Sequence, residues 1–312
     1  MNMDQIFNEL SADGSYSSRE DSEKGLMQLA DISGEMVNIG FSPILRTTEN
    51  FSSLELCPGF TIHECILKNI KDPRAKLFLT YATKSPYVND ILNSKQKGIL
   101  SEFSYKSKEV FGLALAFMNN IPALSLSCFP EGRINLEHTI LNADKSLSIK
   151  TVNAETISSI EMFIQRRDFL QNAVWNCIKN GIDLIEQFAR LFPSLYLSRH
   201  AQENIASLNG NEEFFREFIR HFAVLNETAR QWKKGIRFKP EGIDFSNETK
   251  RTLEEYRDEH TFTCYDGEAR LFSAHSKIKS ANQRIYFFHD VATNIVHIGH
   301  AGKHLHTAKY HN

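Results

Sequence analysis

The most distinctive chemistry in the sequence lies at its C-terminal end, where histidines are concentrated. Five of the twelve histidines fall within the last sixteen residues, together with two lysines and two glycines. The imidazole group exchanges protons near neutral pH and also binds metal ions. The stretch therefore allows three interpretations: exposed polar residues after an edge strand, a metal site, or acid–base catalysis. The five histidines are His297, His300, His304, His306 and His311.

The metal interpretation depends on His300 and His304. They are four residues apart, a spacing that places two imidazoles on one face of a helix. However, Gly299 and Gly302 lie in and after an alternating apolar run, which predicts a strand and a turn rather than a helix. Without a helix the spacing carries no ligand geometry, although Asp290 could add a carboxylate. We therefore expect no metal and no cofactor.

Cleavage of RNA is the chemistry that the neighbouring residues favour. One imidazole can accept the proton of a ribose 2′-hydroxyl while a second donates a proton to the leaving oxygen. Permanent cations stabilise the charge that develops on the phosphate. Because the nucleophile belongs to the RNA, this reaction needs no metal ion. The predicted catalytic residues are His300 and His304 as base and acid, with Arg270, Arg284 and Lys303 on the phosphate, and the predicted RNA contacts beside them are Lys277 and Tyr286.

Three strand-length segments must position these side chains, at 269–277, 283–290 and 294–300. The connection "ATN" before the last segment is short enough for a hairpin. Consecutive strands joined in this way form an antiparallel meander. The sequence therefore predicts a small antiparallel sheet at the C-terminal end.

Strand alternation predicts which side chains share a face of that sheet. Arg284 and Tyr286 fall on one face, because successive side chains point to opposite sides of a strand. In the first segment, Arg270 falls on the face opposite to His275 and Lys277. These three residues therefore line one cleft only if the segment bends near 273–275 or if the strand ends beyond Ser276.

A basic stretch, "RQWKKGIRFK" at 230–239, precedes the meander. Cations that contact phosphates and aromatic rings that stack on bases are typical of single-stranded RNA binding. The alternative is a solvated helix end with a core tryptophan. The predicted second RNA surface consists of Arg230, Trp232, Lys233, Lys234 and Arg237.

The remaining sequence predicts an α+β protein in three parts. Residues 1–155 form an α/β domain, 156–210 a helical linker region, and 211–312 a C-terminal module. We expect helices at 22–39, 211–234 and from Ser246 onward. Further strands are expected at 43–47, 60–67, 75–82, 123–129, 134–142, 147–152 and, as a short leading strand, in "SLYLS" at 194–198.

The C-terminal stretch resembles the core of the RelE/HigB/ParE toxin superfamily. The similarity lies in the strand that bears Arg270, in "RIYFF" at 284–288, in "NIVHIGH" at 294–300 and in the glycine-containing turn "GKHLHT" at 302–307. It covers at most residues 194–312. It implies two helices and an antiparallel sheet of three or four strands, and an endoribonuclease that acts on mRNA, often at the ribosome. Where superfamily members usually have paired lysines this chain has "GKHLHT", and it lacks the closing helix of many members. Some members act on gyrase instead.

Composition narrows the class of protein. A net charge of −2 excludes a globally basic nucleic-acid binder, although a local basic face remains compatible with it. No apolar run approaches the ~20 residues that span a bilayer, and the first residues lack the pattern of a signal peptide. The five scattered cysteines fit reduced thiols. We therefore expect a cytoplasmic protein with no membrane partner.

Together these features predict a metal-independent endoribonuclease, a bacterial toxin or phage-defence effector. Its expected partners are RNA, including ribosome-bound mRNA, and an antitoxin or partner defence protein. One alternative is a non-catalytic module that binds nucleic acid or protein through a toxin-like fold. Another is a metal-dependent nuclease in the N-terminal part that uses converging acidic residues. The acids considered for it are Glu9, Asp13, Glu102 and Glu109.

Overall fold

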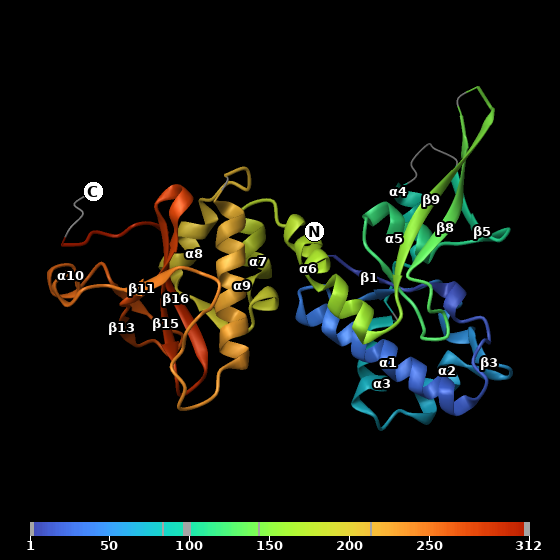
Figure 1. Cartoon of the computed structure of the whole chain (residues 1–312), viewed down its shortest axis with the longest axis horizontal. Helices are drawn as coiled ribbons and strands as arrows, with labels where there is room; N and C mark the ends of the chain where they lie inside the picture. Colours follow the sequence, from blue (N-terminus) through green and yellow to red (C-terminus); the bar gives the residue numbers. More distant parts are fainter. Residues whose placement is uncertain (1–2, 83, 96–100, 143, 213, 309–312) are drawn as a thin grey trace. The chain divides into compact units, whose positions relative to one another are not determined.

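The computed structural model describes residues 3–82, 84–95, 101–142, 144–212 and 214–308. The chain forms two compact units that divide after Val174, and both contain helices and strands, which confirms the α+β class (Figure 1). Among the described residues, no helix combines the length and the apolar character needed to cross a membrane.

The N-terminal unit is built on a twisted sheet and short strand pairs. The strands are β1 (Gln5–Ile6), β2 (Leu45–Arg46), β3 (Glu55–Cys57), β4 (Phe60–Thr61), β5 (Ser101–Tyr105), β6 (Lys108–Glu109), β7 (Ala123–Leu124), β8 (Arg133–Leu141) and β9 (Leu147–Ile157). The main sheet has the order β6-β5-β8-β9-β7. The predicted strands at 134–142 and 147–152 are thus confirmed as a long hairpin, visible in green in Figure 1.

Six helices surround this framework within the described part of the unit. They are α1 (Arg19–Asn38), α2 (Ile62–Lys68), α3 (Pro73–Ala82), α4 (Val88–Lys95), α5 (Gly112–Asn119) and α6 (Ile160–Asn176). The predicted helix at 22–39 is confirmed as α1. It begins after Ser18, whose hydroxyl accepts a hydrogen bond from Asp21 N.

The strands predicted at 60–67 and 75–82 are wrong, because both segments are helices, α2 and α3. A capping box begins α2: the Thr61 hydroxyl accepts from Glu64 N, and the Glu64 carboxylate accepts from Thr61 N. In α3, Pro73 occupies the first position, where a missing N–H does no harm. Short apolar runs do not distinguish a helix from a strand, and the capping signals decide here.

The C-terminal unit contains a five-stranded sheet and a small hairpin. The strands are β10 (Leu195–Leu197), β11 (Phe245–Asn247), β12 (Thr261–Thr263), β13 (Ala269–Leu271), β14 (Ala274–Ile278), β15 (Gln283–Asp290) and β16 (Ile295–Lys303). The sheet order is β10-β16-β15-β14-β11, with β10 parallel to β16 and the other pairs antiparallel. The predicted meander and the leading strand at 194–198 are confirmed. The sheet has one more strand than expected, because β11 pairs with β14.

In the described part of this unit four α-helices accompany the sheet: α7 (Gly181–Leu191), α8 (Arg199–Ala206), α9 (Phe215–Gln231) and α10 (Lys250–Glu255). Helix α9 covers one face, which we call the α9 face, and α7 lies behind it (Figure 1). The apolar stripe of α9 is fully buried, and the burial of each of its side chains contributes about 1.5–3 kcal/mol to the stability of the fold. The stripe consists of Phe215, Phe218, Phe222 and Leu225.

The opposite face carries polar side chains, and we call it the polar face. His275 lies opposite Tyr286 in the neighbouring strand, and Tyr286 lies opposite His300 in the next. The β12–β13 hairpin packs over part of this face, where Phe262 and Phe272 contact Tyr286 in one apolar cluster. The rest of the polar face holds the ionisable groups described below.

Two local predictions in the C-terminal unit are wrong. The segment 269–277 is two strands in different sheets, with the break at 272–273. The predicted helix from Ser246 begins later: Ser246 lies in β11, and Thr249 caps α10 by accepting from Thr252 N. Both differences have the same cause, a tertiary contact: β11 pairs with β14, which draws 245–247 into a strand and separates 274–278 from 269–271.

The unit boundary also differs from the predicted divisions at 155/156 and 210/211. The region expected to be a linker contains α7, β10 and α8, which belong to the C-terminal unit. Strand β10 is part of the sheet because it pairs with β16 along Leu195–Leu197. The start of helix α8 is fixed to β16, because Ser198 Oγ donates to Gly299 O at 2.8 Å.

Candidate functional site

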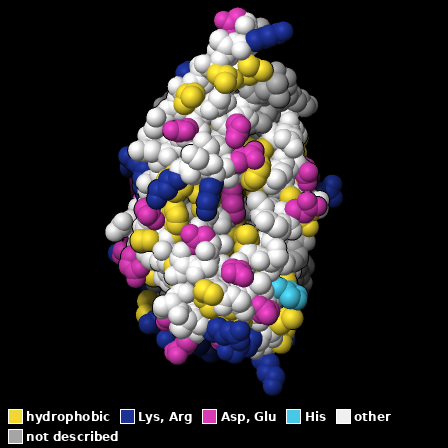
Figure 2. All heavy atoms as spheres, turned by 90° about the vertical axis from the view of Figure 1, so that its right-hand side faces the viewer, with side chains coloured by type: hydrophobic (Ala, Val, Ile, Leu, Met, Phe, Trp, Pro, Cys, Tyr) yellow, Lys and Arg dark blue, Asp and Glu magenta, His cyan; other side chains and the backbone are white. Residues whose placement is uncertain are grey.

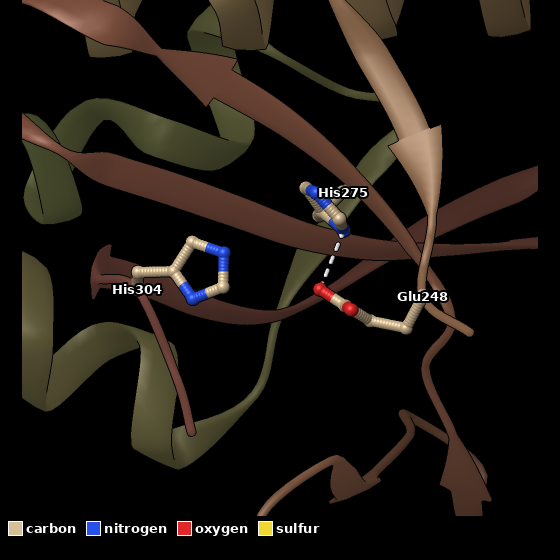
Figure 3. A group of neighbouring side chains, drawn as sticks. All are labelled: Glu248, His275 and His304. Carbon is tan, nitrogen blue, oxygen red and sulfur yellow. Dashed lines mark ion pairs between the residues drawn. The ribbon is translucent and has the colours of Figure 1, made fainter. Parts of the chain in front are cut away.

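Three ionisable side chains meet on the polar face: Glu248, His275 and His304. Each offers one ligand atom, and these atoms all lie within 4.8 Å of one another. They come from the end of β11, from β14 and from the segment after β16, and they point toward one another in Figure 3. Within the described residues, no other group of three His, Cys, Asp or Glu side chains meets the same distance criterion.

Glu248 is held by both its backbone and its carboxylate. Its N–H donates to Ser273 O at 2.8 Å, across the β11–β14 pair. Its Oε1 accepts from the Tyr286 hydroxyl at 3.0 Å. Burial, followed by the nearby Glu248 carboxylate, raises the pKa of Tyr286. Tyr286 is therefore a neutral hydroxyl that orients the carboxylate.

His275 is the most enclosed member of the cluster, with 3% of its surface exposed. Its Nε2 forms a hydrogen bond with Ser246 Oγ at 3.1 Å. Its Nδ1 lies 3.1 Å from Glu248 Oε1 (dashed in Figure 3), but the two atoms are not aligned for a hydrogen bond. Burial lowers the pKa of His275 to about 3, and the Arg284 guanidinium acts in the same direction. The imidazole is therefore neutral at physiological pH.

His304 completes the cluster from the chain that leaves β16. Its N–H donates to Asn282 O at 3.2 Å, which ties this segment to the turn before β15. Its Nδ1 lies 2.6 Å from Leu305 O. Because a carbonyl oxygen only accepts, Nδ1 carries the proton, and in a neutral ring the lone pair lies on Nε2. Figure 3 shows the edge of the ring that carries Nε2 turned toward His275 and Glu248.

Arg284 brings a positive charge to this end of the polar face. It lies two residues from Tyr286 in β15, on the same side of the strand. Burial lowers the pKa of His275, and the Arg284 charge adds to this effect. The hydrogen bond from Lys279 lowers the pKa of Asp244, and Arg284 again acts in the same direction, so its charge is felt by both residues. Its Nε is buried without a hydrogen-bond partner, and within the described chain no carboxylate forms an ion pair with it. Lys277 is on the same face and lies 3.9 Å from Asp244.

His300 shares the polar face with Arg284, but its ring is engaged inside the protein. Its Nε2 donates to Lys303 O at 2.7 Å, which leaves its Nδ1 to accept from His200 Nε2 at 3.0 Å. Burial lowers the pKa of His300 to about 4. Since both ring nitrogens are occupied, His300 fixes the turn that precedes His304 and has no nitrogen available for a substrate proton.

Two of the other predicted phosphate contacts lie away from the cluster. Arg270 is in β13, where it forms an ion pair with Asp266 and stands over the Phe288 ring. Lys303 pairs with Gln283 in the β15–β16 register, so alternation directs its side chain to the α9 face. The structure thus brings together His304, Arg284, Lys277 and Tyr286 from the predicted set.

The predicted second RNA surface lies on the α9 face. Trp232 packs edge-on against His289, and its Nε1 donates to Ile236 O at 2.7 Å. Lys233 and Arg237 line an adjoining hollow of about 480 Å³, but Glu227 lines it too. Arg230 forms an ion pair with Glu227, and Lys234 is exposed in the same loop. The sheet therefore separates this surface from the histidine cluster. Strand alternation did not predict this separation, because the basic stretch lies outside the strands.

The remaining C-terminal histidines have separate environments. His297 is buried among Tyr196, Tyr265 and Phe288. His306 contacts the Glu259 carboxylate at 2.9 Å. His311 lies outside the described residues.

The N-terminal acids do not form a comparable group among the described residues. The Glu9 carboxylate accepts from Gly112 N at 2.9 Å and from Phe111 N at 2.5 Å, at the start of α5. Burial raises the pKa of Glu9. On the face of the molecule shown in Figure 2, acidic and basic side chains are interspersed.

Sequence reasoning did not select Glu248, and it mentioned His275 only in placing it opposite Arg270. Glu248 sits in a segment expected to be helical, where an acid looks like an ordinary surface residue. A signal for His275 did exist, since alternation from Tyr286 through a hairpin directs the partner strand's histidine to the same face. Comparison with protein families, curated proteins and solved structures finds no significant match for this chain.

Proposed function

We propose that the C-terminal unit is a metal-independent endoribonuclease that acts through Glu248, His304 and Arg284. One observation carries the proposal: a carboxylate, an imidazole and a guanidinium without a carboxylate partner gather at one end of the polar face. A base, an acid and a permanent cation are the three groups that attack by a ribose 2′-hydroxyl requires.

Glu248 acts as the base and His304 as the acid. The carboxylate accepts the 2′-hydroxyl proton while the 2′-oxygen forms a bond to phosphorus. The bond from phosphorus to the 5′-oxygen breaks, and His304 donates a proton to that oxygen. The products are a 2′,3′-cyclic phosphate and a 5′-hydroxyl, so no water or redox partner is consumed. Arg284 stabilises the negative charge that develops on the phosphate oxygens.

Tyr286, His275 and His300 serve as positioning residues. Tyr286 donates to the Glu248 carboxylate, and His275 lies against it with a neutral ring. His300 holds the turn at 300–303 through Lys303 O, and this turn delivers His304. This assignment keeps His304 as the acid and replaces His300 by Glu248 as the base.

The order of elements supports a RelE-like fold for this unit. A leading strand (β10), two helices (α9 and α10, in the segments 211–234 and 246–258) and an antiparallel meander (β14 to β16) follow one another in the order that the resemblance implies. Helix α8, strand β11 and the β12–β13 hairpin are additions. A toxin or phage-defence effector that cleaves mRNA, with an N-terminal unit that senses a trigger or recruits a partner, fits this arrangement.

The test is cleavage of an end-labelled RNA by the purified full chain in the presence of EDTA. We expect products that end in a 2′,3′-cyclic phosphate, and no cleavage of the matching DNA. Glu248→Gln, His304→Ala and Arg284→Ala should each reduce the rate by about a hundredfold or more. Arg270→Ala is the matched control, because its guanidinium is committed to Asp266.

Cleavage of DNA at a similar rate, or loss of cleavage with EDTA, would refute the proposal. If no RNA is cut but RNA binds, the C-terminal unit is the non-catalytic interaction module considered above. Expression in bacteria gives a parallel readout: a ribonuclease should slow growth, and Glu248→Gln should restore it.

A further inference from the structure

We propose that Glu248, His275 and His304 also form a binding site for one divalent transition-metal ion of the zinc class. The donors are two imidazole nitrogens and one carboxylate oxygen, whose atoms lie within 4.8 Å of one another. Imidazole with carboxylate suits zinc, cobalt and nickel, whereas calcium and magnesium prefer all-oxygen sites.

The hydrogen bonds around the two rings indicate which nitrogen of each ring faces the ion. His304 donates from Nδ1 to Leu305 O, so its lone pair lies on Nε2. His275 engages Ser246 Oγ through Nε2, which leaves Nδ1 on the side of Glu248. Metal-binding histidines generally use their second nitrogen in this way, since the outer hydrogen bond fixes the tautomer and the ring orientation.

The environment of His275 Nδ1 supports the same site. This nitrogen is buried, and it lies 3.1 Å from Glu248 Oε1 without hydrogen-bond geometry. A buried polar atom without a hydrogen-bond partner is unfavourable. A cation bound between the two atoms would satisfy both.

The fit requires a modest rearrangement of His304. Zinc bonds of about 2.0–2.2 Å place tetrahedral ligand atoms about 3.3 Å apart. His275 and Glu248 already have this separation, at 3.1 Å. His304 follows the last strand and lies outside the sheet, so its ring is the one that moves. The nearby Arg284 charge opposes a cation, so we expect micromolar rather than nanomolar binding.

Metal binding and RNA cleavage would exclude each other. A bound ion occupies the Glu248 carboxylate that accepts a proton in cleavage, and it displaces the proton that His304 must donate. Zinc should therefore inhibit the proposed ribonuclease and EDTA should relieve the inhibition; this consequence rests on the proposed function, whereas metal binding itself does not.

The experiment titrates the full chain with ZnCl₂ by calorimetry and with CoCl₂ by visible absorption. We expect one equivalent with micromolar Kd, and a cobalt spectrum typical of tetrahedral or five-coordinate geometry. Glu248→Gln and His304→Ala should weaken binding by about tenfold or more. His306→Ala is the matched control, since its imidazole lies two residues away against Glu259. Circular dichroism without metal checks that each variant is folded.

The outcomes separate the two proposals. Absence of binding at millimolar zinc, or binding that both site variants leave unchanged, would overturn the metal site. RNA cleavage without metal binding would leave the ribonuclease intact. Stoichiometric binding that activates cleavage, or leaves it unaffected, would support the metal site and overturn the metal-independent mechanism at these residues.

Discussion

The buried histidine of α9 gives a sharp prediction about stability in acid. His221 is 1% exposed, and its Nδ1 forms a hydrogen bond with Ser276 Oγ at 3.1 Å. Burial lowers the pKa of His221 to about 4, and Arg220 acts in the same direction. In the unfolded chain a histidine has a pKa of about 6.5. As pH falls, the unfolded state therefore binds the proton first.

Proton binding by the unfolded state makes the free energy of unfolding fall with pH. For His221 this loss begins near pH 6.5 and continues until the folded pKa is reached near pH 4. Each pH unit within this window removes about 1.4 kcal/mol, so at pH 5 the loss is about 2 kcal/mol. Above pH 7 the residue contributes no pH dependence.

The assay is urea unfolding of His221→Gln and of the parent at pH 8 and pH 5. Trp232, which packs against His289, reports on the C-terminal unit if Trp175→Phe is the common background. Glutamine retains a polar partner for Ser276 but does not titrate. We expect the variant to lose about 2 kcal/mol less than the parent between the two pH values. Equal losses would show that a buried neutral His221 is not a source of acid sensitivity.

Three further predictions concern packing and capping. Gly299→Ala should destabilise the C-terminal unit by about 1–3 kcal/mol, because the added Cβ would overlap the buried Phe262 ring; thermal melting measures this. Gly34→Ala lies in α1 with open space around the new Cβ, so it should instead stabilise the protein by up to about 1 kcal/mol and raise its melting temperature. Glu9→Ala should remove about 1–3 kcal/mol, since two N–H groups at the start of α5 lose their acceptor. Hydrogen exchange at the Phe111 and Gly112 amides should become faster in this variant. Unchanged protection of these amides would contradict the role of Glu9 as their acceptor.

The sequence by itself determined the elements whose patterns are long and regular. The 20-residue helix α1, the hairpin of β8 and β9, and the strand β15 all follow from periodicity. Alternation also placed Arg284 and Tyr286 on one face, because successive side chains of a strand point to opposite sides. The concentration of histidines at the C-terminal end led to His304, one member of the cluster.

Only the tertiary structure decided which groups meet. Glu248 comes close to His275 because β11 pairs with β14, a contact between segments with no shared sequence pattern. His300 is withdrawn from chemistry by His200, a residue 100 positions away on α8. The basic loop after α9 lies across the sheet from the cluster because α9 packs its apolar stripe on the other face. Non-local pairing and burial, which periodicity does not encode, set the site.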